Sequence, residues 1–100
     1  MTQASAPTWP RRPEALVRAL EQLWQQGQQP DPYAFIAANG PRSPVEVAAV
    51  LACDQWQRWH AGQRVPAEEY LGRCPDLATD AGAALELIYG EFLVRQALGE

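Results

Sequence analysis

Few side chains in this sequence could bind a metal or act as a nucleophile. Cys53, His60 and Cys74 are its only cysteines and histidine, and a closed zinc site would need one more ligand. Their spacing matches no zinc motif. Cys53 and His60 could form a thiol–imidazole pair, but about two turns of a predicted helix, roughly 10 Å, separate them. We therefore expect no metal, no cofactor and two reduced thiols that pack as small apolar side chains.

Paired carboxylates are the other arrangement that could do chemistry, as a general acid and base. Glu68 and Glu69 are adjacent, and Glu86 and Glu91 lie further along the chain. On helices, side chains at these spacings point in different directions. We expect solvated faces, so the sequence predicts no enzyme activity. A small enzyme or metal protein is the alternative, which only an assay would reveal.

The overall composition limits the classes of partner. The chain has 100 residues, a net charge of −4 and no lysine, whereas nucleic-acid binding needs several basic side chains to neutralise phosphates. No apolar run reaches the roughly 18 residues of a membrane span, and the N-terminus lacks the apolar core of a signal peptide. We therefore expect a cytoplasmic protein that binds neither nucleic acid nor membrane.

The elements that position these residues are predicted to be helices. Hydrophobic residues make up 47% of the chain; alanine and leucine lead and β-branched residues are few, which favours helices packed on helices. We predict an all-α chain with a disordered leader at 1–12 and a single helical domain at 13–100. Proline and glycine positions, with a capping-box pattern from Ser43 to Glu46, place long helices near 13–26, 44–61 and 80–98 and short connecting helices near 32–37 and 67–71.

A shift of about 35 residues aligns two parts of the chain. It aligns Trp24 with Trp59, Gly27 with Gly62, Phe35 with Tyr70, and Ile36 with Leu71. Each unit is predicted to be a long helix, a glycine stop and a short helix that folds an aromatic side chain back onto the long one. Chance similarity between two ordinary helix ends is the alternative. The structural clamp that this repeat predicts consists of Trp24, Trp59, Phe35, Tyr70 and Leu71.

The last predicted helix carries more apolar residues than one partner needs. Its main face, expected to meet the core, consists of Leu85, Ile88, Tyr89, Phe92 and Leu93. The excess consists of Leu87, Val94 and Leu98, which we predict to be an interaction surface for a protein partner or for self-association. The alternative is that this flank is buried. Gly90 inside the helix costs about 1 kcal/mol relative to alanine, which suggests a close backbone contact or a partner there.

The second half of the chain resembles a known region of bacterial signalling proteins. It is similar to the segment just upstream of the kinase domain in planctomycete-type bacterial serine/threonine protein kinases. The residues that carry the resemblance are Trp59, Gly62, Pro66, Tyr70, Leu71, Pro75, Leu77, Leu87, Ile88, Tyr89, Glu91, Phe92, Arg95, Gly99 and Glu100. The resemblance implies a segment attached to a kinase, since the chain has no glycine-rich phosphate loop, no lysine and no catalytic-loop motif.

These observations together predict a non-catalytic regulatory or protein-interaction module, the N-terminal part of a bacterial serine/threonine protein kinase. A homo-oligomerisation element is the alternative. Its association would depend on protein concentration, so a sedimentation or light-scattering series distinguishes the two.

Overall fold

The computed structural model describes residues 13–39 and 43–99. The predicted leader at 1–12 lies outside the described residues. Within them the chain forms helices and no strand, so the prediction of an all-α chain is confirmed for this part. The helices are α1 (Pro13–Gln25), α2 (Pro32–Asn39), α3 (Pro44–His60), α4 (Ala67–Arg73), α5 (Pro75–Ala78) and α6 (Ala81–Ala97). The short α5 was not predicted; Pro75 occupies its first turn, and the buried Leu77 anchors it in the core.

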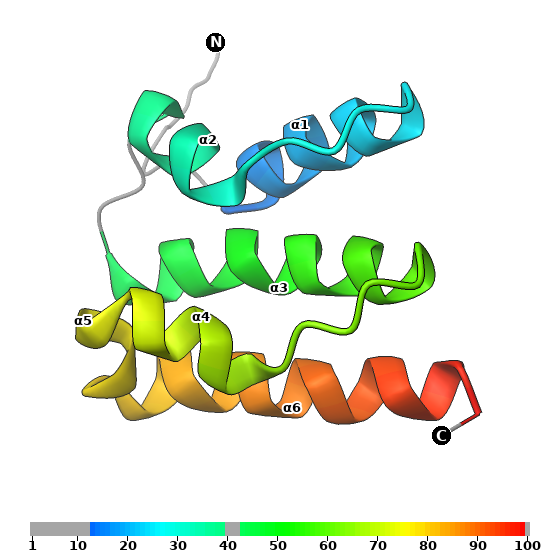
Figure 1. Ribbon diagram of the computed structural model, residues 1–100. Coiled ribbons are helices and arrows are strands. Elements are labelled where there is room, and N and C mark those ends of the chain that lie inside the picture. The colour runs from blue at the N-terminus through cyan, green and yellow to red at the C-terminus, as the bar shows by residue number, and fades with distance from the viewer. Residues whose placement is uncertain (1–12, 40–42, 100) are drawn as a thin grey trace, which may run out of the picture.

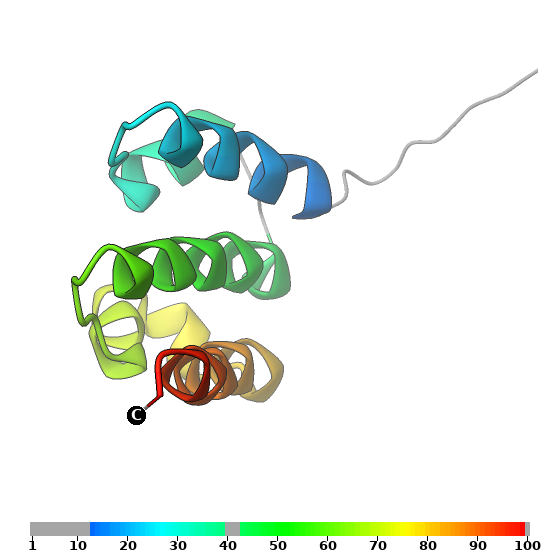
Figure 2. The ribbon, with the colours of Figure 1, turned by 90° about the vertical axis from the view of Figure 1, so that its right-hand side faces the viewer.

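The three longest helices lie one above another, with α3 in the middle (Figure 1). They run in the same direction, because the short helices carry the chain back between them. α3 packs against α1 on one side and against α6 on the other. In the view along the helices, α1 and α6 lie on opposite sides of α3 (Figure 2). The position of α3 explains its broad apolar stripe, because α3 buries apolar side chains against both α1 and α6.

Side chains cap the starts of α3 and α6. Ser43 and Glu46 form the predicted capping box at the start of α3: the Glu46 amide donates to Ser43 Oγ, and the Ser43 amide donates to Glu46 Oε1. Asp80 accepts from the Ala83 amide at the start of α6. These bonds pair amide groups that a helix cannot pair itself.

The ends of α1 and α3 have the same local conformation. Gly27 and Gly62 both adopt φ of 87°, in the left-handed region that favours glycine. The Gly27 amide donates to the Trp24 carbonyl, and the Gly62 amide donates to the Trp59 carbonyl, each at 3.0 Å. Both helices therefore stop in the same type of glycine turn.

The core has two parts, one on each side of α3. The first lies between α1 and α3 and contains Leu20, Val50 and Cys53. The second lies among α3, α4, α5 and α6 and contains Ala48, Leu51, Ala67, Tyr70, Leu77, Ala83 and Leu87.

The face of α6 that meets the core is not the predicted one. Leu87 and Val94 are fully buried, so the prediction that they form an exposed interaction surface is wrong. The predicted core face is exposed instead, as the exposed fractions of 62% for Leu85 and 53% for Phe92 show. Of the three predicted surface residues, only Leu98 is exposed.

Two polar contacts explain why the side of α6 that contains Leu87 and Val94 faces the core. The backbone carbonyl of Leu87 accepts a hydrogen bond from the buried side chain of Gln55 on α3. The Glu91 carboxylate accepts from the Ala67 amide at 2.7 Å and so pairs a free N–H at the start of α4. Both contacts require the face that contains residues 87, 91 and 94 to point inward.

Candidate functional site

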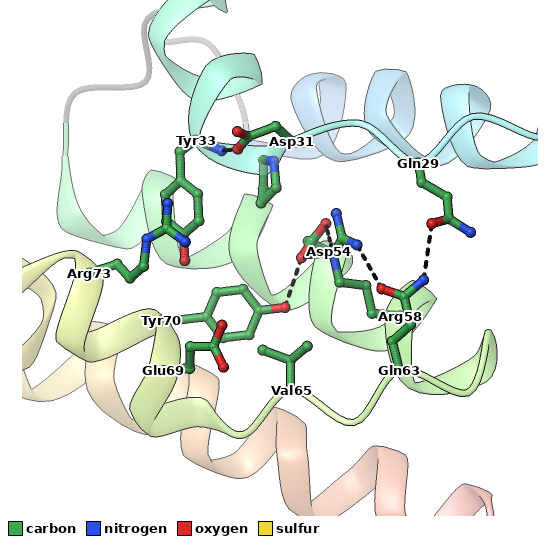
Figure 3. A pocket seen from close by; sticks show the side chains of 11 residues that line it. Gln29, Asp31, Tyr33, Asp54, Arg58, Gln63, Val65, Glu69, Tyr70 and Arg73 are labelled. Atoms are coloured by element: carbon green, nitrogen blue, oxygen red, sulfur yellow. Dashed lines mark hydrogen bonds and ion pairs between the residues drawn. The ribbon is translucent and has the colours of Figure 1, made fainter.

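A polar cavity of about 400 Å³ opens between the start of α2, the middle of α3 and α4 (Figure 3). Seven of the eleven residues that line it carry a charge or a hydroxyl group, so this cavity is a candidate site for chemistry. Its lining consists of Gln29, Asp31, Pro32, Tyr33, Asp54, Arg58, Gln63, Val65, Glu69, Tyr70 and Arg73.

Asp54 is the centre of this group. Its carboxyl is fully buried, and Oδ2 accepts a hydrogen bond from the Tyr70 hydroxyl at 2.7 Å. Arg58, one turn further along α3, donates from Nε to both carboxyl oxygens, at 3.1 and 2.9 Å. Burial raises the pKa of Asp54, although the bonds from Tyr70 and Arg58 act in the opposite direction.

Arg58 connects the two glycine turns. One terminal nitrogen donates to the Gln63 side chain and the other to the Pro30 backbone carbonyl, each at 2.9 Å. The Gln63 amide in turn donates to Gln29 at 3.0 Å. The Arg58 guanidinium also lies over the Trp24 ring, 5.1 Å from its centroid. One side chain thus joins the segment after α1 to the segment after α3.

The geometry suits a role in holding the fold together. Asp54, Arg58, Gln63 and the Tyr70 hydroxyl all bond to one another or to the backbone, which is what buried polar groups require. Burial and the neighbouring Asp54 carboxylate raise the pKa of Tyr70, so its phenol stays protonated and acts as a hydrogen-bond donor. Asp54 and Arg58 give no sequence signal of a site, because a pair at this spacing on a helix ordinarily lies on the surface.

The predicted clamp residues lie in or beside the core. Trp59 is buried, and its indole nitrogen donates to the Val65 carbonyl at 2.9 Å, across the turn that follows α3. The Trp24 indole nitrogen is also buried but has no hydrogen-bond partner among the described residues. Phe35 and Trp24 pack against the part of the core under α1, whereas Tyr70 and Leu71 belong to the part beside α6.

The cysteines and the histidine occupy separate places. Cys53 packs under α1, and its thiol donates to the Val17 carbonyl at 3.8 Å. Cys74 lies against the other part of the core, and the exposed His60 bonds to the Trp56 carbonyl on its own helix. Burial raises the pKa of Cys53 to about 12. In residues 13–39 and 43–99, no three histidine, cysteine or acidic side chains lie close enough together to hold a metal ion.

The four glutamates of the acid–base hypothesis do not form one site. Glu68, Glu69 and Glu86 are exposed. Glu91 is half-buried and engaged twice, with the Ala67 amide and with Arg95, which lies 2.7 Å away. Its capping of α4 was not predicted, since a carboxylate on α6 gives no sequence signal of contact with a helix start so far away in the chain.

The second candidate site is the exposed apolar face of α6. This face consists of Leu85, Ile88, Tyr89, Phe92 and Leu93, and Trp56 of α3 continues it; each of these side chains is 40% exposed or more. The rings of Tyr89 and Phe92 stack with centroids 6.1 Å apart. No helix lies below α6 in Figure 1, and the exposed fractions show that no helix in the described part of the chain covers this face.

A groove of about 630 Å³ runs beside this face, between α3 and α6. Small residues leave room in it, and large apolar side chains form its walls. Its lining consists of Ala52, Trp56, Gly82, Leu85, Glu86, Tyr89, Gly90 and Leu93. A site of this kind buries apolar side chains of a partner and offers little that could take part in a reaction.

No helix in the described residues is long and apolar enough to cross a bilayer. The chain matches no protein-family model, no curated protein and no solved structure, so the resemblance to the segment upstream of bacterial kinase domains rests on the residues that carry it.

Proposed function

We propose that this chain is a non-catalytic protein-interaction module that binds a protein partner through the apolar face of α6. In keeping with the resemblance of its second half, we place it upstream of the kinase domain of a bacterial serine/threonine protein kinase, in the cytoplasm. The observation that carries the proposal is the exposure of Leu85, Ile88, Tyr89, Phe92 and Leu93 along one helix.

The size of this surface supports the proposal. The five side chains of this face and Trp56 are each about half exposed. Together they present about 600 Å² of apolar surface. The largest apolar patch on a typical monomer is about 300–600 Å² and is often functional. Aromatic side chains are enriched at the centres of protein interfaces, and Trp56, Tyr89 and Phe92 supply three here.

The order of the helices supports it as well. α3 packs between α1 and α6, whereas α6 packs against α3, α4 and α5 and leaves one apolar side exposed. We propose that α1 with α2 and α3 with α4 are two copies of a unit of about 35 residues, and that α6 begins the same arrangement again. The matching glycine turns after α1 and α3 favour this proposal. In stacked helical units each one buries the face of its neighbour, so the exposed apolar face of α6 is a surface that a further unit or another protein would cover.

Capture experiments with matched variants test the proposal. Phe92→Arg places a charge in the middle of the face, and Leu98→Arg places the same charge on an exposed leucine about a third of a turn away around the helix. The immobilised wild-type chain and Leu98→Arg should retain the same protein from a lysate of the source cells. Phe92→Arg should retain at least about tenfold less of it.

Two results would count against the proposal. Equal capture by all three chains would move the interaction away from α6. No capture by any of them, together with a wild-type chain that stays monomeric in solution, would argue against an interaction module. The sequence of the parent gene checks the attachment separately, since a kinase domain is expected downstream of this segment.

A further inference from the structure

We infer that the partner of the α6 face is a second copy of this chain, which makes the module a symmetric dimer. This inference rests on the proposed function, because it identifies the occupant of the same surface.

The exposed face of α6 and the groove beside it are complementary in shape. Ile88 and Phe92 project from the outer side of α6 as a ridge, since they lie one turn apart. The groove between α3 and α6 begins on the neighbouring side of the same helix. In a twofold interface the same patch serves both partners, so the ridge of each copy must find a groove in the other. This patch has both parts.

The floor of the groove has the composition that such packing needs. Gly82 of α6 and Ala52 of α3 leave space in it. Its walls are the side chains of Leu85, Tyr89, Leu93 and Trp56. Small residues between large ones form the holes into which side chains of a facing helix insert.

The exposed apolar area is of the size that a dimer interface buries. A standard interface buries about 800 Å² per partner, of which roughly 500 Å² is apolar. The face of α6 with Trp56 presents about 600 Å² of apolar surface. A single contact between two copies would therefore cover the exposed apolar surface almost completely, and the area is what a stable dimer needs.

The groove contains almost no charged side chains. Glu86 is the one charged side chain among the groove-lining residues that the structure describes, so the surface offers no pattern of charges to select an acidic or a basic partner. A nearly uncharged apolar surface pairs best with another apolar surface, and a second copy of the chain presents one.

The test is the mass of the full chain in solution. Sedimentation velocity from about 1 μM to about 1 mM covers the usual range of weak and moderate dimers. Wild type should shift from the mass of one chain to the mass of two and stay dimeric at high salt, because salt does not weaken apolar burial. Leu98→Arg should show the same change of mass with concentration as wild type. Phe92→Arg should stay monomeric, because the dissociation constant of its dimer should be at least about a hundredfold higher.

Circular dichroism of each variant accompanies the mass measurement. If Phe92→Arg loses helicity, Tyr89→Ser replaces it, since Tyr89 is 60% exposed. A wild-type chain that is monomeric throughout overturns the inference, and so does a dimer that survives both substitutions. A third result separates the two proposals: wild type stays monomeric but captures another protein, and Phe92→Arg abolishes that capture. This result would overturn the inference that the partner is a second copy and would leave the proposed function intact.

Discussion

The side-chain amide of Gln55 on α3 donates a hydrogen bond to the backbone carbonyl of Leu87 on α6, at 3.2 Å. Gln55 is 1% exposed, so this bond pairs an amide that would otherwise be buried without a partner. It depends on Gly90, where a Cβ would lie 2.5 Å from Gln55 Oε1. The glycine that weakens α6 as a helix therefore permits its closest polar contact with α3.

Gly90→Ala should destabilise the protein for this reason. Alanine favours a helix over glycine by about 1 kcal/mol, but the new Cβ displaces Gln55, and a buried polar group that loses its bond costs about 1–3 kcal/mol. Gly72→Ala in α4 is the matched control, because a Cβ there meets nothing within 4 Å. Urea unfolding should show a loss for Gly90→Ala and a gain of up to about 1 kcal/mol for Gly72→Ala. A gain for both would contradict the role assigned to Gln55.

Tyr70→Phe should cost about 1–3 kcal/mol, since it leaves the buried Asp54 carboxyl without one of its donors. The ring stays, so the loss reports the hydrogen bond of 2.7 Å and not the packing. Tyr89→Phe removes a hydroxyl from a side chain that is 60% exposed and should change the stability by a few tenths of a kcal/mol at most. Chemical denaturation in dilute solution compares the two, and equal effects would show that the Asp54 contact contributes little.

Leu87→Glu with Val94→Glu should unfold the protein. Both side chains are fully buried, and each substitution places a carboxylate in the core without a partner. Loss of the helical signal in circular dichroism at neutral pH is the expected result. Phe92→Glu is the control on the opposite side of the same helix and should keep its helicity. A double variant that stays folded would mean that this side of α6 is not in the core.

The two thiols should differ in reactivity. Burial raises the pKa of Cys53 to about 12, so its thiolate is scarce near pH 8 and shielded as well. Burial also raises the pKa of Cys74, but this side chain is partly exposed. Ellman's reagent should titrate one thiol in the native protein and two in denaturant. Cys53→Ser should leave the native count unchanged, and two fast thiols in the native wild type would contradict the placement of Cys53.

The sequence by itself determined where the helices begin and end. Those signals are local: Pro44 and the Ser43–Glu46 capping box start α3, Gly62 stops it, and Asp80 starts α6. Each acts through atoms within a few residues, so it can be recognised without knowledge of the fold. The short α5 escaped prediction because a single turn has too few residues to show a period.

Only the tertiary structure decided which side of α6 faces inward. Leu87 and Val94 lie almost opposite Leu85 and Phe92 around the helix, and both sides are apolar, so hydrophobicity alone could not choose between them. The choice was made by contacts between distant segments: Gln55 with the Leu87 carbonyl, and Glu91 with the Ala67 amide.

The same reason hid the Asp54 network from the sequence. Asp54 and Arg58 are near neighbours on one helix, but Tyr70 and the Pro30 carbonyl reach them only after α4 and the segment before α2 have packed against α3. Burial converts an ordinary surface pair into a buried network, and burial is a property of the assembled fold.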